Sequence, residues 1–252
     1  MTDNSAVLTE TRGRVLLITL NRPEAMNAIN TDLAQGLLSA IEHLDSDDGL
    51  TAGVLTGNGR GFCSGMDLKA FAAGGPPKGF DQFLKQGARK PLIAAIEGFA
   101  IAGGLEVALT CDLLVAAEDA KIGIREVKVG LFAAGGALLR LPRRLPYSVA
   151  MEMALTGEAI TAGEAKNYGL VSRVTDKGGT IQSAMELAEQ IAQNAPLAVA
   201  ASKLLIQAQQ GITEEEFWEL QKSHMKKVFT SNDAKEGPSS FAEKRAPNWS
   251  GT

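Results

Sequence analysis

Short apolar strands alternate with helical segments along the first 145 residues, and this alternation limits the possible folds more than any other feature of the chain. Runs of four to seven mainly apolar residues are typical of strands buried on both faces, as in a parallel sheet. Between the early runs, Leu33, Leu37, Leu38 and Ile41 recur at helical spacing. Strands alternating with helices predict an α/β fold. The strands we expect are 6–11, 14–20, 52–56, 92–96 and 113–116.

The second part of the chain has a different pattern. From about Arg140 the apolar residues follow mainly helical spacing, as in the stripe formed by Ile181, Met185 and Ala188. We therefore divide the chain into an α/β core at 1–145 and a helical region at 146–252. Apolar faces on these helices favour a contact between subunits, although the helices could also pack on their own core.

Composition and charge exclude several classes of protein. A chain of 252 residues with 45% hydrophobic and 21% charged residues is globular rather than disordered. The net charge of −4 and the absence of a basic cluster argue against nucleic-acid binding. No apolar run approaches the roughly 18 residues of a membrane span, and residues 1–5 do not resemble a signal peptide. Only Cys63 and Cys111 are present, so we expect a reduced, cytoplasmic protein.

Two glycine-rich turns, at 61–65 and 98–104, each follow an expected strand. Glycine lets a backbone approach a ligand closely, and a helix start leaves N–H groups without partners inside the helix. Two such groups aimed at one point form an oxyanion hole. Taken separately, each stretch is better explained as a tight turn between a strand and a helix. Neither matches a phosphate-binding or dinucleotide-binding motif.

Two glutamates stand out for different reasons. Glu106 lies within the apolar run 105–109, where a carboxylate is expensive to bury without a partner. It could equally be a glutamate in the first turn of a helix, favoured there by the helix dipole. Glu126 lies between Arg125 and Lys128, and a surface ion pair is its simplest interpretation.

Other catalytic or metal-binding arrangements have little support. Ser64 lacks the motif of a nucleophile elbow, and His43 and His224 are distant from it in the sequence. Two histidines and two scattered cysteines do not have the spacing of metal ligands, so we expect no metal site.

The order of the motifs resembles the crotonase (enoyl-CoA hydratase/isomerase) superfamily. The segments that carry the resemblance are Asn-Arg-Pro-Glu-Ala-Met-Asn-Ala at 21–28, Phe-Cys-Ser-Gly-Met-Asp-Leu at 62–68 and Gly-Phe-Ala-Ile-Ala-Gly-Gly-Leu-Glu at 98–106. The similarity continues through 123–136 to 236–245. It implies a spiral of repeated β-β-α units followed by a helical trimerisation region, assembled as a trimer or a dimer of trimers.

The resemblance also implies roles for individual residues. The backbone N–H groups of Met66 and Gly103 correspond to the thioester oxyanion hole, and Glu106 and Glu126 correspond to two catalytic glutamates. Phe241 and Lys244 correspond to residues that reach the adenine and phosphate end of coenzyme A from a neighbouring subunit. No separate cofactor is implied, since coenzyme A is part of the substrate. The remaining positions implied to bind the acyl-CoA are Glu24, Ala25, Met26, Ser64, Asp67, Leu68 and Gly104.

With both glutamates present, the sequence favours an enoyl-CoA hydratase of lipid metabolism, which adds water reversibly to a trans-2-enoyl-CoA to give a 3-hydroxyacyl-CoA. Three alternatives stay open: a carnitinyl-CoA-type dehydratase, a Δ3,Δ2-enoyl-CoA isomerase and a non-catalytic CoA-binding protein. Three departures from the family pattern bear on the choice. Glu24 replaces a frequent basic residue, Arg125 replaces a frequent proline, and residues 131–134 around Ala133 lack another proline.

Overall fold

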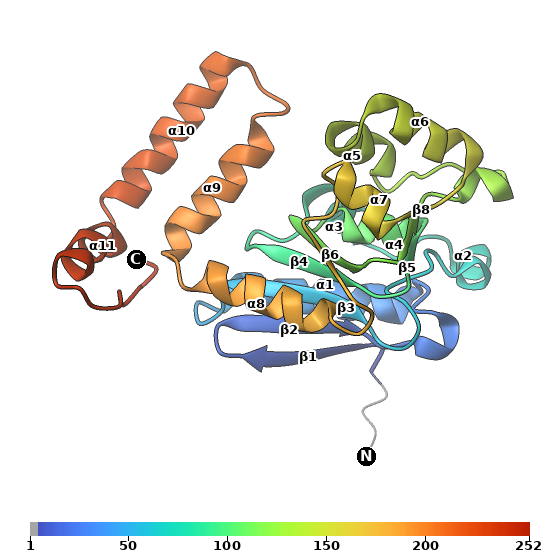
Figure 1. Ribbon diagram of the computed structural model, residues 1–252, viewed down its shortest axis with the longest axis horizontal. Helices are drawn as coiled ribbons and strands as arrows, with labels where there is room; N and C mark the ends of the chain where they lie inside the picture. The colour runs from blue at the N-terminus through green and yellow to red at the C-terminus, as the bar shows by residue number, and fades with distance from the viewer. Residues whose placement is uncertain (1–4) are drawn as a thin grey trace.

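The computed structural model describes residues 5–252, so most of the 1–5 segment considered for a signal peptide lies outside the described residues. The chain forms a mixed α/β body from which the last helices extend to one side (Figure 1), and the predicted α/β class is confirmed. The strands are β1 (Val7–Arg12), β2 (Val15–Leu20), β3 (Ala52–Gly57), β4 (Leu92–Ile96), β5 (Phe99–Ile101), β6 (Leu113–Ala117), β7 (Lys121–Gly123), β8 (Ile160–Thr161) and β9 (Arg173–Thr175). The helices are α1 (Thr31–Ser46), α2 (Leu68–Gly74), α3 (Phe80–Gln86), α4 (Gly103–Ala108), α5 (Ala137–Arg144), α6 (Tyr147–Thr156), α7 (Ala162–Asn167), α8 (Thr180–Ala192), α9 (Pro196–Ala208), α10 (Glu214–Phe229) and α11 (Asn232–Ala242), with 3-10 turns η1 (Pro23–Ala25) and η2 (Glu126–Val129).

The strands form two sheets that the chain visits in turn. The larger sheet has the order β1-β2-β3-β4-β6-β9 and is parallel apart from the β1–β2 pair. The smaller sheet has the order β5-β7-β8. The chain passes from β4 to β5 and then α4, and next from β6 to β7, so each repeat advances by one strand in both sheets. The repeated β-β-α units expected from the sequence are therefore present.

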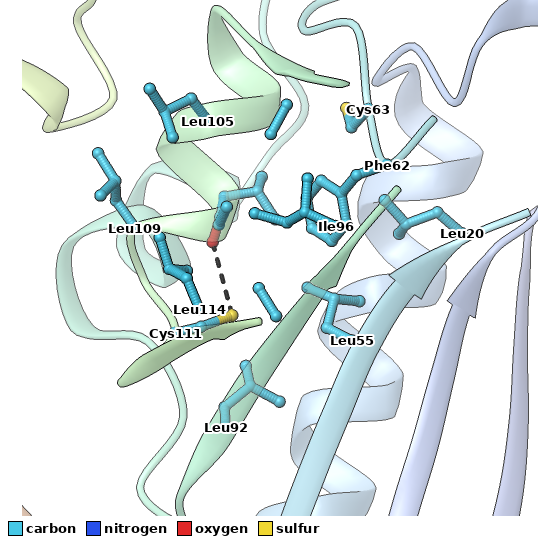
Figure 2. Packing of buried hydrophobic residues seen from close by; sticks show 14 of the residues in the cluster. Leu20, Leu55, Phe62, Cys63, Leu92, Ile96, Leu105, Leu109, Cys111 and Leu114 are labelled. Carbon is cyan, nitrogen blue, oxygen red and sulfur yellow. Dashed lines mark hydrogen bonds between the residues drawn. The ribbon is translucent and has the colours of Figure 1, made fainter. Parts of the chain in front are cut away.

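The side chains of the larger sheet alternate between two hydrophobic clusters, as the pleat of a strand requires. One face carries Leu16, Leu55, Leu92 and Ile96, all almost completely buried. Figure 2 shows Ile96 beside Phe62, which follows β3, with Leu105 of α4 and Leu109, which directly follows α4, nearby. This cluster anchors both glycine-rich turns, because Phe62 lies in the first turn and α4 begins in the second.

The opposite face of the larger sheet is covered by α8. Val54, Ile93 and Val115 point to this side and pack with Met185 and Ala188 of α8. In addition, β9 pairs with β6. Residues beyond 145, up to Ala192, therefore complete the larger sheet and its cover. The strands β8 and β9 interrupt the region expected to be helical.

Helices α9, α10 and α11 extend away from the sheets (Figure 1). A polar contact joins this arm to the body: Lys203 Nζ in α9 lies 2.7 Å from Asp112 Oδ2 and donates to the Lys90 carbonyl at 2.8 Å. Asp112 also accepts the Leu92 N–H at 2.9 Å. Within residues 5–252, no helix is long and apolar enough to cross a membrane.

Truncating Met185 tests whether α8 belongs to the core. Because Met185 is only 4% exposed, we expect Met185→Ala to lower the free energy of unfolding by about 2–5 kcal/mol. Glu189→Ala, an exposed position on the same helix, is the matched control and should change it by less than about 0.5 kcal/mol. Denaturant titration measures both, and equal midpoints for the two variants would contradict the assignment.

Candidate active site

The two glycine-rich turns meet in the structure. The segment after β3 bridges to β5 through Cys63 and Ala100, which places residues 63–66 beside the start of α4. A Cβ atom added to Gly103 would lie 3.4 Å from the Met66 backbone nitrogen. Among the described residues, neither the Met66 nor the Gly103 N–H has a hydrogen-bond acceptor. Two adjacent N–H groups without acceptors have the arrangement that an oxyanion requires.

The backbone around Met66 is held by its neighbours so that its own N–H stays free. The Ile29 N–H donates to the Gly65 carbonyl at 2.8 Å, and the Asp67 N–H donates to the Ile29 carbonyl at 3.0 Å. These bonds engage the residues on either side of Met66. Gly65 has φ of 103°, and a Cβ there would lie 3.1 Å from the Gly103 nitrogen, so glycine permits the close approach of the two turns.

The second N–H is aimed by an unusual backbone conformation. Ala102 precedes α4 with φ of 52° and ψ of −129°, which a non-glycine residue rarely adopts. Its own N–H is fixed by the Gly123 carbonyl at 2.9 Å. Gly103 then begins α4, where the first N–H groups have no partner inside the helix. Backbone strain of this kind is found where the surrounding structure holds a functional group in place.

Glu106 is buried in α4, with only 5% of its surface exposed. Its Oε1 accepts the Ala137 N–H at 3.2 Å. Burial raises the pKa of the Glu106 carboxyl, the Ala137 N–H opposes that rise, and the nearby charge of Glu126 raises the pKa further. Both sequence-based interpretations hold in part, because Glu106 lies in the first turn of α4 and is also a buried carboxyl beside a second one.

Glu126, at the start of η2, is half-buried, and its Oε2 is buried without a hydrogen-bond partner in the described part of the chain. Burial raises the pKa of this carboxyl as well. The surface ion pair predicted for Glu126 is wrong: Lys128 bonds to Glu158 instead, and Arg125 is exposed. A buried carboxylate oxygen without a partner is costly, and such groups are common where a ligand completes the site.

The residues expected along coenzyme A fall into two separate groups. The Ser64 N–H donates to the Met26 carbonyl at 3.1 Å, which joins η1 to the loop that leads to Met66. Glu24, Met26 and Leu68 are exposed beside this loop, and Ala25 is half-buried. Phe241 belongs to α11, and Lys244 follows it. Helix α11 lies on the opposite side of the molecule from α2 (Figure 1). One chain therefore does not bring these two residues to the glutamates.

Two of the expected ligand contacts have clear internal roles. Asp67 caps α2 by accepting the Ala70 N–H at 3.2 Å, and its carboxylate lies 3.3 Å from the Arg22 guanidinium. The Ala70 N–H and Arg22 lower the pKa of this carboxyl, so it is ionised and already paired. Gly104 is buried, and a Cβ there would lie 2.2 Å from the Cys63 carbonyl, so its lack of a side chain serves the packing of the two turns.

Sequence reasoning missed the groups that surround Glu106. The Ala137 N–H, the close approach of Gly135 and the charge of Arg140 all come from the segment before and within α5. A Cβ added to Gly135 would lie 2.5 Å from Glu106 Oε2. The Gly-Gly pair at 135–136 was the only signal for these contacts, and it does not name the partner.

The alternatives considered for catalysis are not assembled into a site. Ser64 has neither histidine among its hydrogen-bond partners, and His43 lies at an exposed helix end 3.5 Å from Asp47. Across residues 5–252, no group of three or more His, Cys, Asp or Glu side chains has a metal-binding arrangement.

Replacing Glu106 tests its electrostatic environment. Because burial raises the native pKa, the folded state binds this proton more tightly than the unfolded chain, and stability falls as the pH rises through the native value. Glu106→Gln keeps an acceptor for Ala137 and removes the charge. We expect it to raise the free energy of unfolding near neutral pH by on the order of 1 kcal/mol. The gain should vanish near pH 4, below the ordinary pKa of 4.5. Denaturant melts at both pH values measure this, and a gain that is independent of pH would contradict it.

Comparisons with known proteins show which family the chain belongs to. Residues 10–252 match the family described as enoyl-CoA hydratase/isomerase. The enoyl-CoA hydratase EchA19 of Mycobacterium tuberculosis is 44% identical, with 96% of this chain and 95% of that protein aligned. A carnitinyl-CoA dehydratase of Proteus mirabilis is 41% identical, with coverage of 96% and 97%.

Solved structures give the same result for the fold. A crystal structure of an enoyl-CoA hydratase from Mycobacterium tuberculosis has a TM-score of 0.95 and 49% identity, and covers 99% of this chain and 100% of that chain. A hydratase from Bacillus anthracis, at 31% identity, has a TM-score of 0.90, with coverage of 98% and 100%. Matches in sequence and in fold extend over nearly the full length, and the chain belongs to the enoyl-CoA hydratase/isomerase family of the crotonase superfamily.

Proposed function

We propose that the protein is an enoyl-CoA hydratase, a hydro-lyase that adds water reversibly to a trans-2-enoyl-CoA to give a 3-hydroxyacyl-CoA. The observation that carries the proposal is the combination of the buried Glu106 and the half-buried Glu126 with two N–H groups that lack acceptors within residues 5–252. Family membership supports a CoA thioester as the substrate. The substrate includes the coenzyme, and no further cofactor enters the proposal.

The proposed chemistry follows from the charges that develop. Water attacks C3, the C2–C3 electron pair moves toward the thioester oxygen, and the N–H groups of Met66 and Gly103 stabilise the resulting negative charge. Glu106, ionised, takes a proton from the water, and Glu126, protonated, donates a proton to C2. The raised pKa of Glu126 suits a proton donor. Since the two carboxyls influence each other, they titrate as a pair.

The proposed path of coenzyme A runs along Glu24–Met26 and the loop from Ser64 to Leu68. Met66, whose N–H has no acceptor within residues 5–252, lies in the middle of this loop. In this proposal Asp67 supports the path by capping α2. Gly104 supports it by allowing α4 to approach the loop closely. The exposed Glu24 offers no charge that attracts a phosphate, which leaves phosphate binding to other residues.

Phe241 and Lys244 enter the proposal as residues of a neighbouring subunit. Phe241 is 86% exposed, and α11 lies well away from α4, the helix that carries Glu106 (Figure 1). An aromatic face can stack on adenine, and a lysine can bind a phosphate. We therefore propose a homo-oligomer, a trimer or a dimer of trimers, in which the arm formed by residues 196–252 completes the coenzyme site of another chain.

A carnitinyl-CoA-type dehydratase is the second candidate. The Proteus mirabilis carnitinyl-CoA dehydratase is nearly as similar as the mycobacterial hydratase, at 41% against 44% identity. Dehydration runs the same steps in reverse and uses the same two carboxyls. A Δ3,Δ2-isomerase is less well supported, because moving one proton between carbons requires a single base and leaves the second buried carboxyl without a role.

Replacing each glutamate tests the reaction. We expect Glu106→Gln and Glu126→Gln each to lower kcat for hydration of crotonyl-CoA by about 10²–10⁴-fold, because each removes one proton transfer. Glu118→Gln, at an exposed position, is the control and should match the parent protein. Full activity in either active-site variant would contradict the two-carboxyl mechanism.

A substrate panel separates the candidates. Short, long, branched and carnitinyl enoyl-CoA thioesters should show highest kcat/KM for one simple trans-2-enoyl-CoA. A preference for the carnitinyl thioester would support the dehydratase. Binding of CoA thioesters without turnover of any would show a non-catalytic relative.

Lys244→Ala tests the shared coenzyme site. We expect it to weaken CoA binding by about fivefold at low salt, and less at high salt, with kcat retained. Lys235→Ala, an exposed lysine of α11, should leave CoA binding unchanged. Sedimentation velocity should show an oligomer, whereas a fully active monomer would contradict the shared site.

A further inference from the structure

The segment that donates to Glu106 is itself held from outside. Ala137 opens α5, and the residues before it, Gly135 and Gly136, belong to no other regular element. The position of the Ala137 N–H, which donates to Glu106, therefore depends on the position of this turn. Arg140, one turn further along α5, is the side chain that ties the turn to the body.

The guanidinium of Arg140 bridges two segments of the chain. Its Nη1 donates to the Gly135 carbonyl at 3.3 Å. Its Nη2 donates to the Leu84 carbonyl, and to the Lys85 carbonyl at 3.2 Å. Leu84 and Lys85 lie in the last turn of α3, where carbonyls have no partner inside the helix. A planar guanidinium can satisfy several such acceptors at once, which a lysine cannot do.

A series of contacts connects the Arg140 bridge to the carboxyl of Glu106. A Cβ added to Gly135 would lie 2.9 Å from Leu84 Cδ1 and 2.5 Å from Glu106 Oε2, so α3, the turn and the carboxyl pack in sequence. Gly136, with φ of 108°, leaves room for Arg140, since a Cβ there would lie 2.3 Å from Nη1. A displacement of the turn therefore moves the groups that contact Glu106.

We propose that Arg140 is a positioning residue for the reaction: its guanidinium holds the turn 135–137 against α3, and this keeps the Ala137 N–H on Glu106. The inference rests on the proposed function for its effect on turnover, whereas the bridge itself stands on the contacts. Arg140 does not touch the reacting atoms in this account. It acts through Ala137 and Gly135.

Arg140 also contributes charge near the carboxyl. The charges that act on Arg140 are those of Glu106 and of Arg143 and Arg144 in α5. The charges that act on Glu106 are those of Glu126 and Arg140. Arg140 lowers the pKa of Glu106, opposing its burial and Glu126. Removing the charge of Arg140 should therefore raise the pKa of Glu106, and replacing it by lysine should not.

Three variants separate the bridge from the charge. Arg140→Gln removes both the charge and the guanidinium bridge, whereas Arg140→Lys keeps the charge and removes the bridge. Arg143→Gln removes the charge of an exposed arginine on the same helix, which bonds to Gln210. Circular dichroism and thermal melts establish that each variant is folded before kinetics are compared.

For Arg140→Gln we expect kcat for the enoyl-CoA that the parent protein hydrates best to fall about 10- to 100-fold, with KM within about threefold, and the acidic limb of the pH profile to move to higher pH. Arg140→Lys should lose kcat similarly and keep the pH profile. Arg143→Gln should match the parent protein. A parent-like kcat in Arg140→Gln or in Arg140→Lys, a change confined to KM, or unfolding of both Arg140 variants would overturn the proposal.

A second readout does not depend on turnover. NMR titration of ¹³C-labelled glutamate carboxyls, with Glu106 assigned by its loss in Glu106→Gln, should give a higher pKa for Glu106 in Arg140→Gln than in the parent or Arg143→Gln. If the parent protein hydrates no enoyl-CoA, the proposed function fails while this titration still decides whether Arg140 acts on Glu106. An unchanged Glu106 titration in Arg140→Gln would overturn the electrostatic part of the inference.

Discussion

The close approach of two backbone turns, one after β3 and one before α4, is the constraint on which the rest of the site depends. The bridge between Cys63 and Ala100 makes the two turns neighbours, and glycine at 65 and 104 removes the side chains that would separate them. Because the chain advances by one strand in both sheets with each repeat, turns from successive repeats come together. The two-layer spiral thus brings together two N–H groups, from segments almost forty residues apart, that have no acceptor in the described part of the chain.

Several features of the site around these N–H groups are energetically unfavourable. Glu106 and Glu126 are both held where burial opposes their ionisation, and Glu126 Oε2 has no partner within residues 5–252. Ala102 adds a strained backbone at the start of α4. The surrounding hydrophobic clusters offset these costs, since the larger sheet is buried on both faces. Such a site loses stability in exchange for groups whose protonation can change during a reaction.

Sequence reasoning reached the α/β class and the early strands because β2, β3 and β4 are buried on both faces and mainly apolar, which leaves a clear pattern. The helical spacing of Leu33, Leu37 and Ile41 was equally clear, and the Asn30 side chain caps that helix by accepting the Leu33 N–H at 2.9 Å. The strands beyond residue 145 were not predicted, because β8 and β9 have only two and three residues, too few for a periodic signal. The candidate pairs Met66 with Gly103 and Glu106 with Glu126 came from the resemblance to a family, not from local pattern.

Other features of the site depend on tertiary contacts that no local pattern contains. The positive φ of Ala102 cannot be read from an alanine, and the unpaired state of Glu126 reverses what its charged neighbours suggest. The Arg140 bridge joins residues more than fifty positions apart. Each of these follows from packing between repeats, which is why the fold was easier to predict than the environment of its carboxyls.

The central claim is that the N–H groups of Met66 and Gly103 receive the thioester oxygen of an acyl-CoA. The most direct measurement is a crystal structure of the protein with a 3-ketoacyl-CoA bound, a thioester whose keto form lacks the C2–C3 double bond that the reaction requires. We expect the thioester oxygen about 3 Å from both backbone nitrogens, with C3 facing Glu106 and Glu126. A bound thioester whose oxygen contacts neither nitrogen would contradict the account.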